Sequence, residues 1–238
     1  MLKKAMEFVV ELARPNVQEI GGEVYSDKSL YRIDHNPKAA TIELTTLSSF
    51  LDYIKSGVDK TSENMIVHVV SPTKVCMYSA LDSDRKREYT VDVKAQIPSF
   101  EFGRFIDHES FCIGLQSKFL DDPHTDRALL LKFAGTVESG TVAQYGDDGI
   151  TQKATVKTGL ASKSDAIVPN PVTLRPFRTF IEVQQPASRF VFRMSDKNSV
   201  QCALFEADGG AWKMDAMQSI KEYLEAQLQD VPGYIVIC

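Results

Sequence analysis

The sequence predicts an α+β fold built mainly from antiparallel sheets with flanking helices. Three strand-like runs, at residues 64–71, 74–82 and 87–97, follow one another with short connections, as in a meander. Helix-like runs stand before and after them in groups. A doubly wound parallel fold would alternate strands with helices, so the grouping favours α+β.

The first element predicted is an amphipathic helix that ends before Pro15. Its apolar face comprises Leu2, Met6, Val9 and Ala13. Residues 15–40 are polar and rich in turn formers, so we expect an arm or loop there. A short strand at 41–44 then leads into a second helix, with Thr46 as its N-cap and Gly57 as its stop. The apolar face of that helix comprises Leu47, Phe50, Leu51 and Ile54.

The third strand of the meander alternates, which predicts a half-buried antiparallel strand. One face comprises Tyr89, Val91, Val93, Ala95 and Ile97, and the other comprises Thr90, Asp92, Lys94 and Gln96. The charged run "DSDRKR" before it reads as an exposed tip.

Helical spacing returns after the meander and then gives way to strands. One predicted helical face comprises Phe102, Phe105, Ile106, Cys112, Ile113, Phe119 and Leu120. Asp122 and Pro123 resemble the start of a further helix that stops at Gly135. The strands predicted beyond it lie at 149–159 and around 172–183, 188–194 and 199–206, with 157–165 as a flexible loop. Asp208 is the expected cap of a closing helix whose inward residues are Met217, Ile220, Leu224 and Leu228, before a last strand, "GYIVI".

These elements suggest a division into 1–40 (helix and arm), 41–134 (a β/α half) and 135–238 (a β-rich half with a closing helix and strand). The alternative is that 41–238 is one domain with a shared core. With 238 residues and 43% hydrophobic residues, the chain can bury a sizeable core.

Composition excludes several function classes. A net charge of −5 argues against broad, non-specific nucleic-acid binding. The four cysteines have no metal-ligand spacing. No signal peptide or membrane-length apolar run is evident, so we expect a cytoplasmic protein without a membrane partner.

The quoted pieces "ATIELTTLSSFLDYIKS", "IVHVV…KVCMYSALD", "DRKREYTVDV" and "FGRFIDHESF", followed by the β-rich half and closing helix, resemble the YfdQ-like proteins of phages and prophages. The resemblance spans roughly residues 40–238. It implies a phage or prophage protein in the host cytoplasm, from a domain family of unknown function with no catalytic residues to carry over.

The best candidate site lies within residues 157–197, where basic and aromatic residues interleave in an otherwise acidic chain. The candidate ligand-binding residues are Lys157, Lys163, Arg175, Arg178, Arg189 and Arg193. Phe177, Phe180, Phe190 and Phe192 alternate with the arginines. Such a face can stack and pair a nucleotide or a single strand. The alternative interpretation puts the phenylalanines in the core and the arginines in water or in ion pairs.

Catalytic and metal motifs are weak. Asp121, Asp122 and His124 could hold a divalent cation, but Asp and Pro residues also cap helix starts. We therefore predict no catalytic residue, no metal and no cofactor. The favoured function is a non-enzymatic phage accessory protein that binds a protein partner or host factor, as a homo-oligomer. The alternatives are a nucleic-acid or nucleotide-signal binder in phage DNA metabolism or anti-defence, and a metal-dependent hydrolase.

Overall fold

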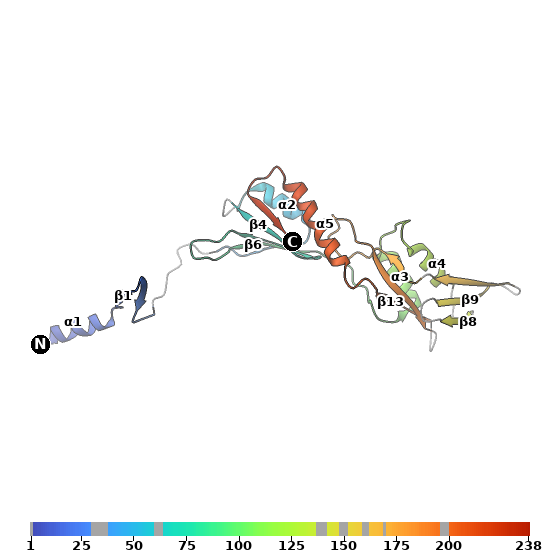
Figure 1. The fold of residues 1–238 in the computed structure, drawn as a ribbon, viewed down its shortest axis with the longest axis horizontal. Coiled ribbons are helices and arrows are strands. Elements are labelled where there is room, and N and C mark those ends of the chain that lie inside the picture. The colour runs from blue at the N-terminus through green and yellow to red at the C-terminus, as the bar shows by residue number, and fades with distance from the viewer. Residues whose placement is uncertain are drawn as a thin grey trace. The chain divides into compact units, whose positions relative to one another are not determined.

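The computed structural model describes residues 2–29, 38–59, 64–136, 142–147, 152–158, 162–168, 170–195 and 200–238, and for residues 136–168 it describes the backbone alone (Figure 1). Contacts within the chain divide it into two compact units, and the boundary in the sequence lies between Lys38 and Ala39. Among the described residues, no helix is long and apolar enough to cross a membrane.

The first unit contains α1 (Leu2–Ala13) and a hairpin of β1 (Val17–Ile20) and β2 (Glu23–Ser26). The predicted first helix is confirmed. The prediction of an arm without regular structure is wrong for 17–26, because Gly21 and Gly22 adopt positive φ and turn the chain between two short strands. Every described side chain of α1, β1 and β2 is exposed.

The second unit contains the remaining elements. Its helices are α2 (Leu47–Ser56), α3 (His108–Lys118), α4 (Arg127–Thr136) and α5 (Trp212–Leu228). Its strands are β3 (Ile42–Leu44), β4 (Met65–Ser71), β5 (Lys74–Ser79), β6 (Tyr89–Lys94), β7 (Ile106–Asp107), β8 (Val142–Asp147), β9 (Gln152–Thr158), β10 (Ser162–Val168), β11 (Val172–Leu174), β12 (Ser188–Ser195), β13 (Gln201–Glu206) and β14 (Tyr234–Ile237). The sheets are mostly antiparallel, so the α+β fold is confirmed.

A five-stranded sheet in the order β14-β4-β5-β6-β3 builds the first core. The predicted meander β4-β5-β6 is confirmed, and β14 and β3 add to its two sides in parallel. Helices α2 and α5 cover one face of this sheet (Figure 1). The predicted caps of α2 are also confirmed, since Thr46 Oγ1 accepts from Ser49 N and Gly57 adopts the left-handed conformation.

One part of the predicted alternation in 87–97 is wrong. A bulge between Met77 and Tyr78 shifts the register, so Tyr89 pairs with Tyr78 while Val91 pairs with Met77. Tyr89 is therefore exposed on the open face of the sheet, and Thr90 is buried. Val91 and Val93 point into the core as predicted.

A four-stranded sheet in the order β11-β12-β13-β7 builds the second core, with α3 and α4 packed on one face. A separate three-stranded sheet has the order β10-β9-β8. The predicted helical face over 102–120 is wrong in extent and phase. Asp107 caps the helix by accepting from Ser110 N, so α3 begins only at His108. Its buried face carries Phe111 and Leu115, and Ile113 is exposed.

Smaller corrections concern connections. The helix predicted from Asp122 begins at Arg127, because 122–126 form a turn held by Asp122. The stretch 157–165, predicted to be a loop, belongs largely to β9 and β10, and its tip at 159–161 lies outside the described residues. The strand predicted at 172–183 is limited to 172–174. Asp208 holds a turn before α5 instead of capping the helix, since its carboxylate accepts from Gly210 N.

Candidate functional site

Arg178 lies at the centre of the most developed polar arrangement in the described chain. The side chain is only 5% exposed, although arginine is rarely buried. Its Nη1 donates to Glu206 Oε1 at 2.7 Å, and its Nη2 donates to Ser188 Oγ. The guanidinium lies over the ring of Trp212, 4.0 Å from the ring centroid. A charged group is thus held between a carboxylate and an aromatic face.

Local sequence explains why Arg178 is placed there. Gln185 folds back on the preceding segment, and its Oε1 accepts from the backbone N–H groups of Arg178 and Thr179. The amide group of Gln185 also donates to the carbonyl of Phe180. The side-chain amide of Gln185 thus holds the 178–185 loop together in place of strand pairing. Thr179 Oγ1 donates to the carbonyl of Pro72, which ties the loop to the β4–β5 turn.

Arg178 forms part of the wall of a cavity of about 380 Å³, which we call the junction cavity because its lining residues come from separate elements, among them the β4–β5 turn, α3, β13 and α5. The wall is mainly apolar and aromatic, with one lysine, one arginine and one glutamate. Its residues are Thr73, Ile97, Pro98, Ser99, Phe100, Phe102, Lys118, Pro176, Phe177, Arg178, Glu206 and Trp212.

Two buried donors of this wall have no hydrogen-bond partner among the described residues, namely Arg178 Nε and Trp212 Nε1. Desolvation lowers the pKa of Arg178 to about 10, while Glu206 and Asp208 oppose the shift. Arg178 is therefore still charged at neutral pH. Lys118 Nζ donates to the carbonyl of Ser99, and no carboxylate of the described chain pairs with it. The cavity wall thus carries a surplus of positive charge.

The other predicted ligand-binding arginines do not join Arg178. Arg175 pairs with Asp122 at 3.1 Å, outside the wall of the cavity. Arg189 and Arg193 lie on the face of β12 opposite to Phe190 and Phe192, whose rings are in the second core. The interpretation that places phenylalanines in the core therefore holds for these rings and for Phe180.

Lys157 and Lys163 are register partners in the β9–β10 hairpin, and their side chains lie outside what the structure describes. A ligand role for the two lysines remains a prediction. The backbone pairing places them opposite each other near the end of that hairpin.

The residues considered for a metal-dependent hydrolase are engaged in other interactions. Asp121 pairs with Arg127 at 2.8 Å. Asp122 pairs with Arg175 and accepts from His124 N, which holds the turn before α4. Within the described ranges, no group of three or more His, Cys, Asp or Glu side chains is placed to hold a metal ion.

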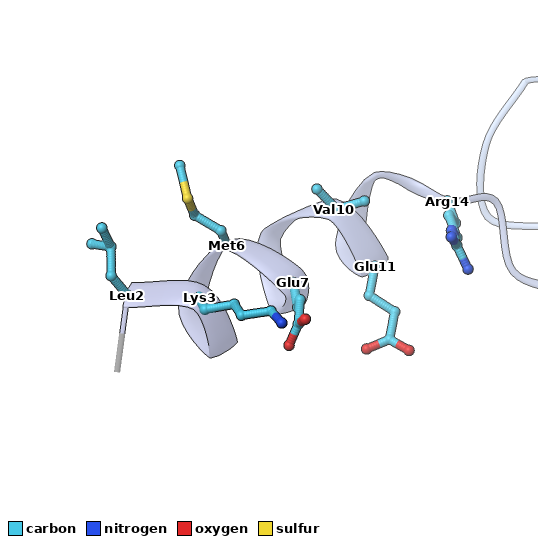
Figure 2. Close-up of a pocket in the computed structure, with 7 residues that line it drawn as sticks. All are labelled: Leu2, Lys3, Met6, Glu7, Val10, Glu11 and Arg14. Atoms are coloured by element: carbon cyan, nitrogen blue, oxygen red, sulfur yellow. The ribbon is translucent and has the colours of Figure 1, made fainter.

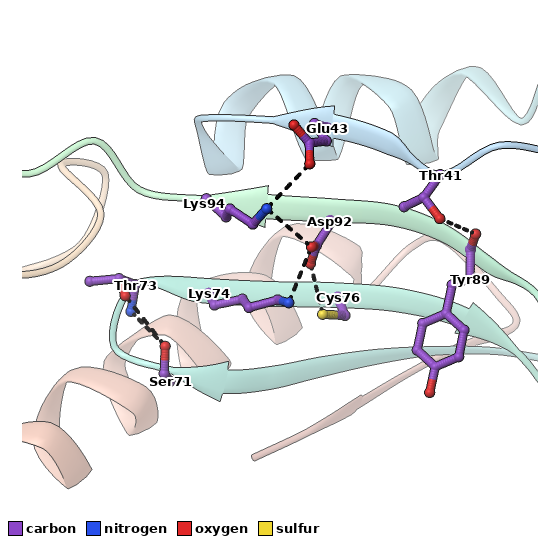
Figure 3. Close-up of polar contacts among 9 residues, drawn as sticks. All are labelled: Thr41, Glu43, Ser71, Thr73, Lys74, Cys76, Tyr89, Asp92 and Lys94. Carbon is purple, nitrogen blue, oxygen red and sulfur yellow. Dashed lines mark hydrogen bonds and ion pairs between the residues drawn. The ribbon is translucent and has the colours of Figure 1, made fainter.

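A second polar cluster lies on the open face of the five-stranded sheet (Figure 3). Asp92 accepts from Cys76 Sγ and pairs with Lys74 at 3.1 Å and with Lys94 at 3.6 Å. Lys94 also bridges to Glu43 on the neighbouring strand. Burial, helped by Asp92, raises the pKa of the Cys76 thiol to about 11. A thiol that holds its proton so firmly is a poor nucleophile, so this cluster stabilises the sheet rather than performing chemistry.

A third surface follows one side of α1 and is drawn in Figure 2. Its lining residues are Leu2, Lys3, Met6, Glu7, Val10, Glu11 and Arg14. All of them belong to α1 or to the residue just after it, so the surface is an uncovered side of the helix rather than an enclosed pocket.

Comparison with known proteins brings no relative: no family model, no curated protein and no solved structure matches this chain.

Sequence reasoning located Arg178 but missed Lys118, Glu206 and Trp212. Glu206 of β13 and Trp212 of α5 are close in the chain, but both are far from Lys118 of α3. Their spacing carries no periodic signal, because the cavity forms where separate elements meet. The one available clue was Trp212, the single tryptophan of the chain. A lone tryptophan at the start of an amphipathic helix does not reveal its partner.

Proposed function

We propose that this chain is a non-enzymatic binding protein of a phage or prophage that works as a homo-oligomer, in which copies associate through α1. The single observation that carries the proposal is the uncovered apolar side of α1. At about 100° per residue, eight residues fall on one side of the helix. They are Leu2, Ala5, Met6, Phe8, Val9, Val10, Leu12 and Ala13.

An isolated helix of this length is unstable on its own. Helices shorter than about 12–15 residues are marginal in water, because nucleation costs more than a few hydrogen bonds return. Two-stranded hairpins such as β1–β2 are marginal for similar reasons. Since no residue of α1 is buried, its stability must come from a surface that covers it.

The charge order of α1 favours a second copy as that surface. Lys3 and Lys4 lie in the first turn and Glu11 lies near the last, the reverse of what the helix dipole prefers. In an antiparallel pair, the N-terminal end of one helix lies beside the negative dipole end of the other, although Lys4 and Glu11 themselves point away from the apolar side. A parallel pair would bring like charges and like dipole ends together.

The size of α1 indicates that the helix pair needs further surface. Twelve residues make a helix about 18 Å long, whereas a stable interface buries about 1,200–2,000 Å² in total. The exposed apolar residues of the hairpin can supply part of the difference. They are Val17, Ile20, Val24 and Tyr25.

Light scattering on the full chain tests the proposal. Wild type is expected to exceed the monomer mass of 26.6 kDa in a concentration-dependent way, and Val9→Asp to be monomeric. Val58→Asp is the matched control, because Val58 is an equally exposed valine on the second unit. It should keep the wild-type mass. The melting temperature of Val58→Asp should match the wild type, and that of Val9→Asp should match the wild type at concentrations where the wild type is monomeric.

A wild-type chain that stays monomeric at all concentrations would refute the proposal. So would wild-type monomers that bind anionic lipid vesicles through α1, because the covering surface would then be lipid.

A further inference from the structure

We infer that the junction cavity is a binding site for a small molecule that joins a flat ring to a carboxylate or phosphate group. This inference is independent of association through α1, since every residue of the cavity wall belongs to the second unit.

The volume of the cavity sets the size of the ligand. Small-molecule sites commonly enclose about 300–1,000 Å³ and are lined mostly by apolar and aromatic side chains with a few polar groups. The junction cavity, at about 380 Å³, lies at the lower end of that range. It has room for one ring system with an attached anionic group, and not for a folded peptide or an oligonucleotide.

The apolar part of the wall selects a flat ring. Phe100, Phe102, Phe177 and Trp212 present aromatic surface from three different segments, and Pro98 and Pro176 add flat aliphatic surface. Phe102 is itself fixed, because it stacks on Phe190 of the second core with centroids 5.3 Å apart. Rings held in this way form a rigid stacking surface that does not need to reorganise on binding.

The polar part of the wall selects an anion. Glu206 offsets the charge of Arg178, which leaves the ammonium of Lys118 as positive charge not paired with a carboxylate of the described chain. Arg178 Nε and Trp212 Nε1 are buried donors without partners in the described chain. Buried donors normally have acceptors, and leaving one unpaired is costly. A carboxylate or phosphate supplies a negative charge and acceptor oxygens for the Lys118 ammonium.

Intrinsic fluorescence provides a direct measurement, because Trp212 is the only tryptophan and lies in the wall. The full chain is titrated with adenosine monophosphate and, separately, with benzoate. At least one is expected to quench or shift the Trp212 emission with saturation at millimolar concentration or below. Inorganic phosphate alone and adenosine alone should bind at least about tenfold more weakly, since each lacks half of the recognised chemistry.

A pair of lysine variants tests the site. Lys118→Gln should weaken binding of the responding probe about tenfold, which is typical of losing one charged hydrogen bond. Lys213→Gln is the matched control: Lys213 Nζ lies 5.9 Å from the Trp212 ring centroid, but the residue is outside the cavity wall. This variant should bind within twofold of wild type. Both variants should keep the wild-type melting temperature.

The outcomes separate the possible ligands. A response to adenosine monophosphate alone assigns the site to nucleotides, and a response to benzoate alone assigns it to aromatic carboxylates. Equal binding of inorganic phosphate would refute the ring requirement. Failure of every probe, or unchanged binding by Lys118→Gln, would overturn the inference. Neither result would affect the proposal of association through α1, which is tested by the mass from light scattering.

Discussion

Helices α1 and α2 are both amphipathic, yet only α2 is covered. Phe50 of α2 is fully buried, whereas Phe8 of α1 is 62% exposed. Helix α2 also has an N-cap, a left-handed glycine at its end and Lys55 in its last turn. Helix α1 has no acidic residue in its first turn and no basic residue in its last. The comparison teaches that α2 is covered within the chain, whereas α1 presents an apolar side that the described residues do not cover.

The largest expected contrast comes from truncating one phenylalanine in each helix. Phe50→Ala should lower the free energy of unfolding by about 3–5 kcal/mol, because it leaves a cavity in the first core. Phe8→Ala should change it by less than about 0.5 kcal/mol in dilute protein, as at other exposed sites. Urea denaturation followed by circular dichroism measures both. A large loss for Phe8→Ala would mean that α1 is covered in the monomer.

Two glycines provide a similar contrast within the second unit, with a smaller effect. A Cβ added at Gly114 in α3 would lie 2.8 Å from the Phe100 ring, so Gly114→Ala should destabilise the protein by about 1–3 kcal/mol. A Cβ added at Gly135 in α4 meets nothing within 4 Å. Gly135→Ala should therefore stabilise by up to about 1 kcal/mol, through helix propensity alone.

Thermal unfolding of the two variants shows whether the contact with Phe100 or helix propensity determines the effect of each substitution on stability. Because Phe100 also lines the junction cavity, Gly114→Ala should alter the Trp212 emission as well, whereas Gly135→Ala should not. Equal stabilisation by both substitutions would show that Phe100 moves aside freely, and would contradict the tight packing between α3 and the cavity wall.

The smallest expected effect concerns the thiols. Burial raises the pKa of Cys76 to about 11 and of Cys202 to about 12. A thiol whose pKa is raised in the folded protein contributes to the free energy of unfolding. The contribution is complete at pH values below the pKa of the unfolded chain, about 8.5, and is lost as the pH rises toward the pKa of the folded protein. The free energy of unfolding should therefore decline from about pH 9 upward.

Thiol labelling of the native protein near neutral pH provides the companion measurement. Cys238 is exposed and should react first, while Cys76 and Cys202 should remain protected. Cys238→Ser should remove the fast reaction and leave the alkaline loss of stability unchanged. A fast reaction that persists in this variant would come from the half-buried Cys112 or show that a buried thiol is accessible.

Local signals predicted much of the fold. The cap residues and apolar spacing of α2 fixed both its ends and its buried face. The alternation in the meander gave the pairing of β4, β5 and β6. These elements could be predicted because the information lies within a few residues of each position.

The remaining features depend on residues distant in the chain. The phase of α3 was wrong because Phe102, Phe105 and Ile106 continue the apolar pattern without belonging to the helix, and only the Asp107 cap marks its start. The sequence left open whether the arginines of 157–197 share one face. Arg178 turns toward Glu206 and Trp212, whereas Arg175 pairs with Asp122. No spacing rule identifies such partners.

The five-stranded sheet has a consequence for synthesis on the ribosome. Strands β4 to β6 emerge early, but α5, which covers them together with α2, is complete only when the chain has passed Leu228. In the meantime an apolar sheet face and the β4 side that later pairs with β14 are open to other chains. Long-range closure of this kind also slows folding. The growing polypeptide therefore passes through an aggregation-sensitive interval that ends only when its last helix and its last strand dock.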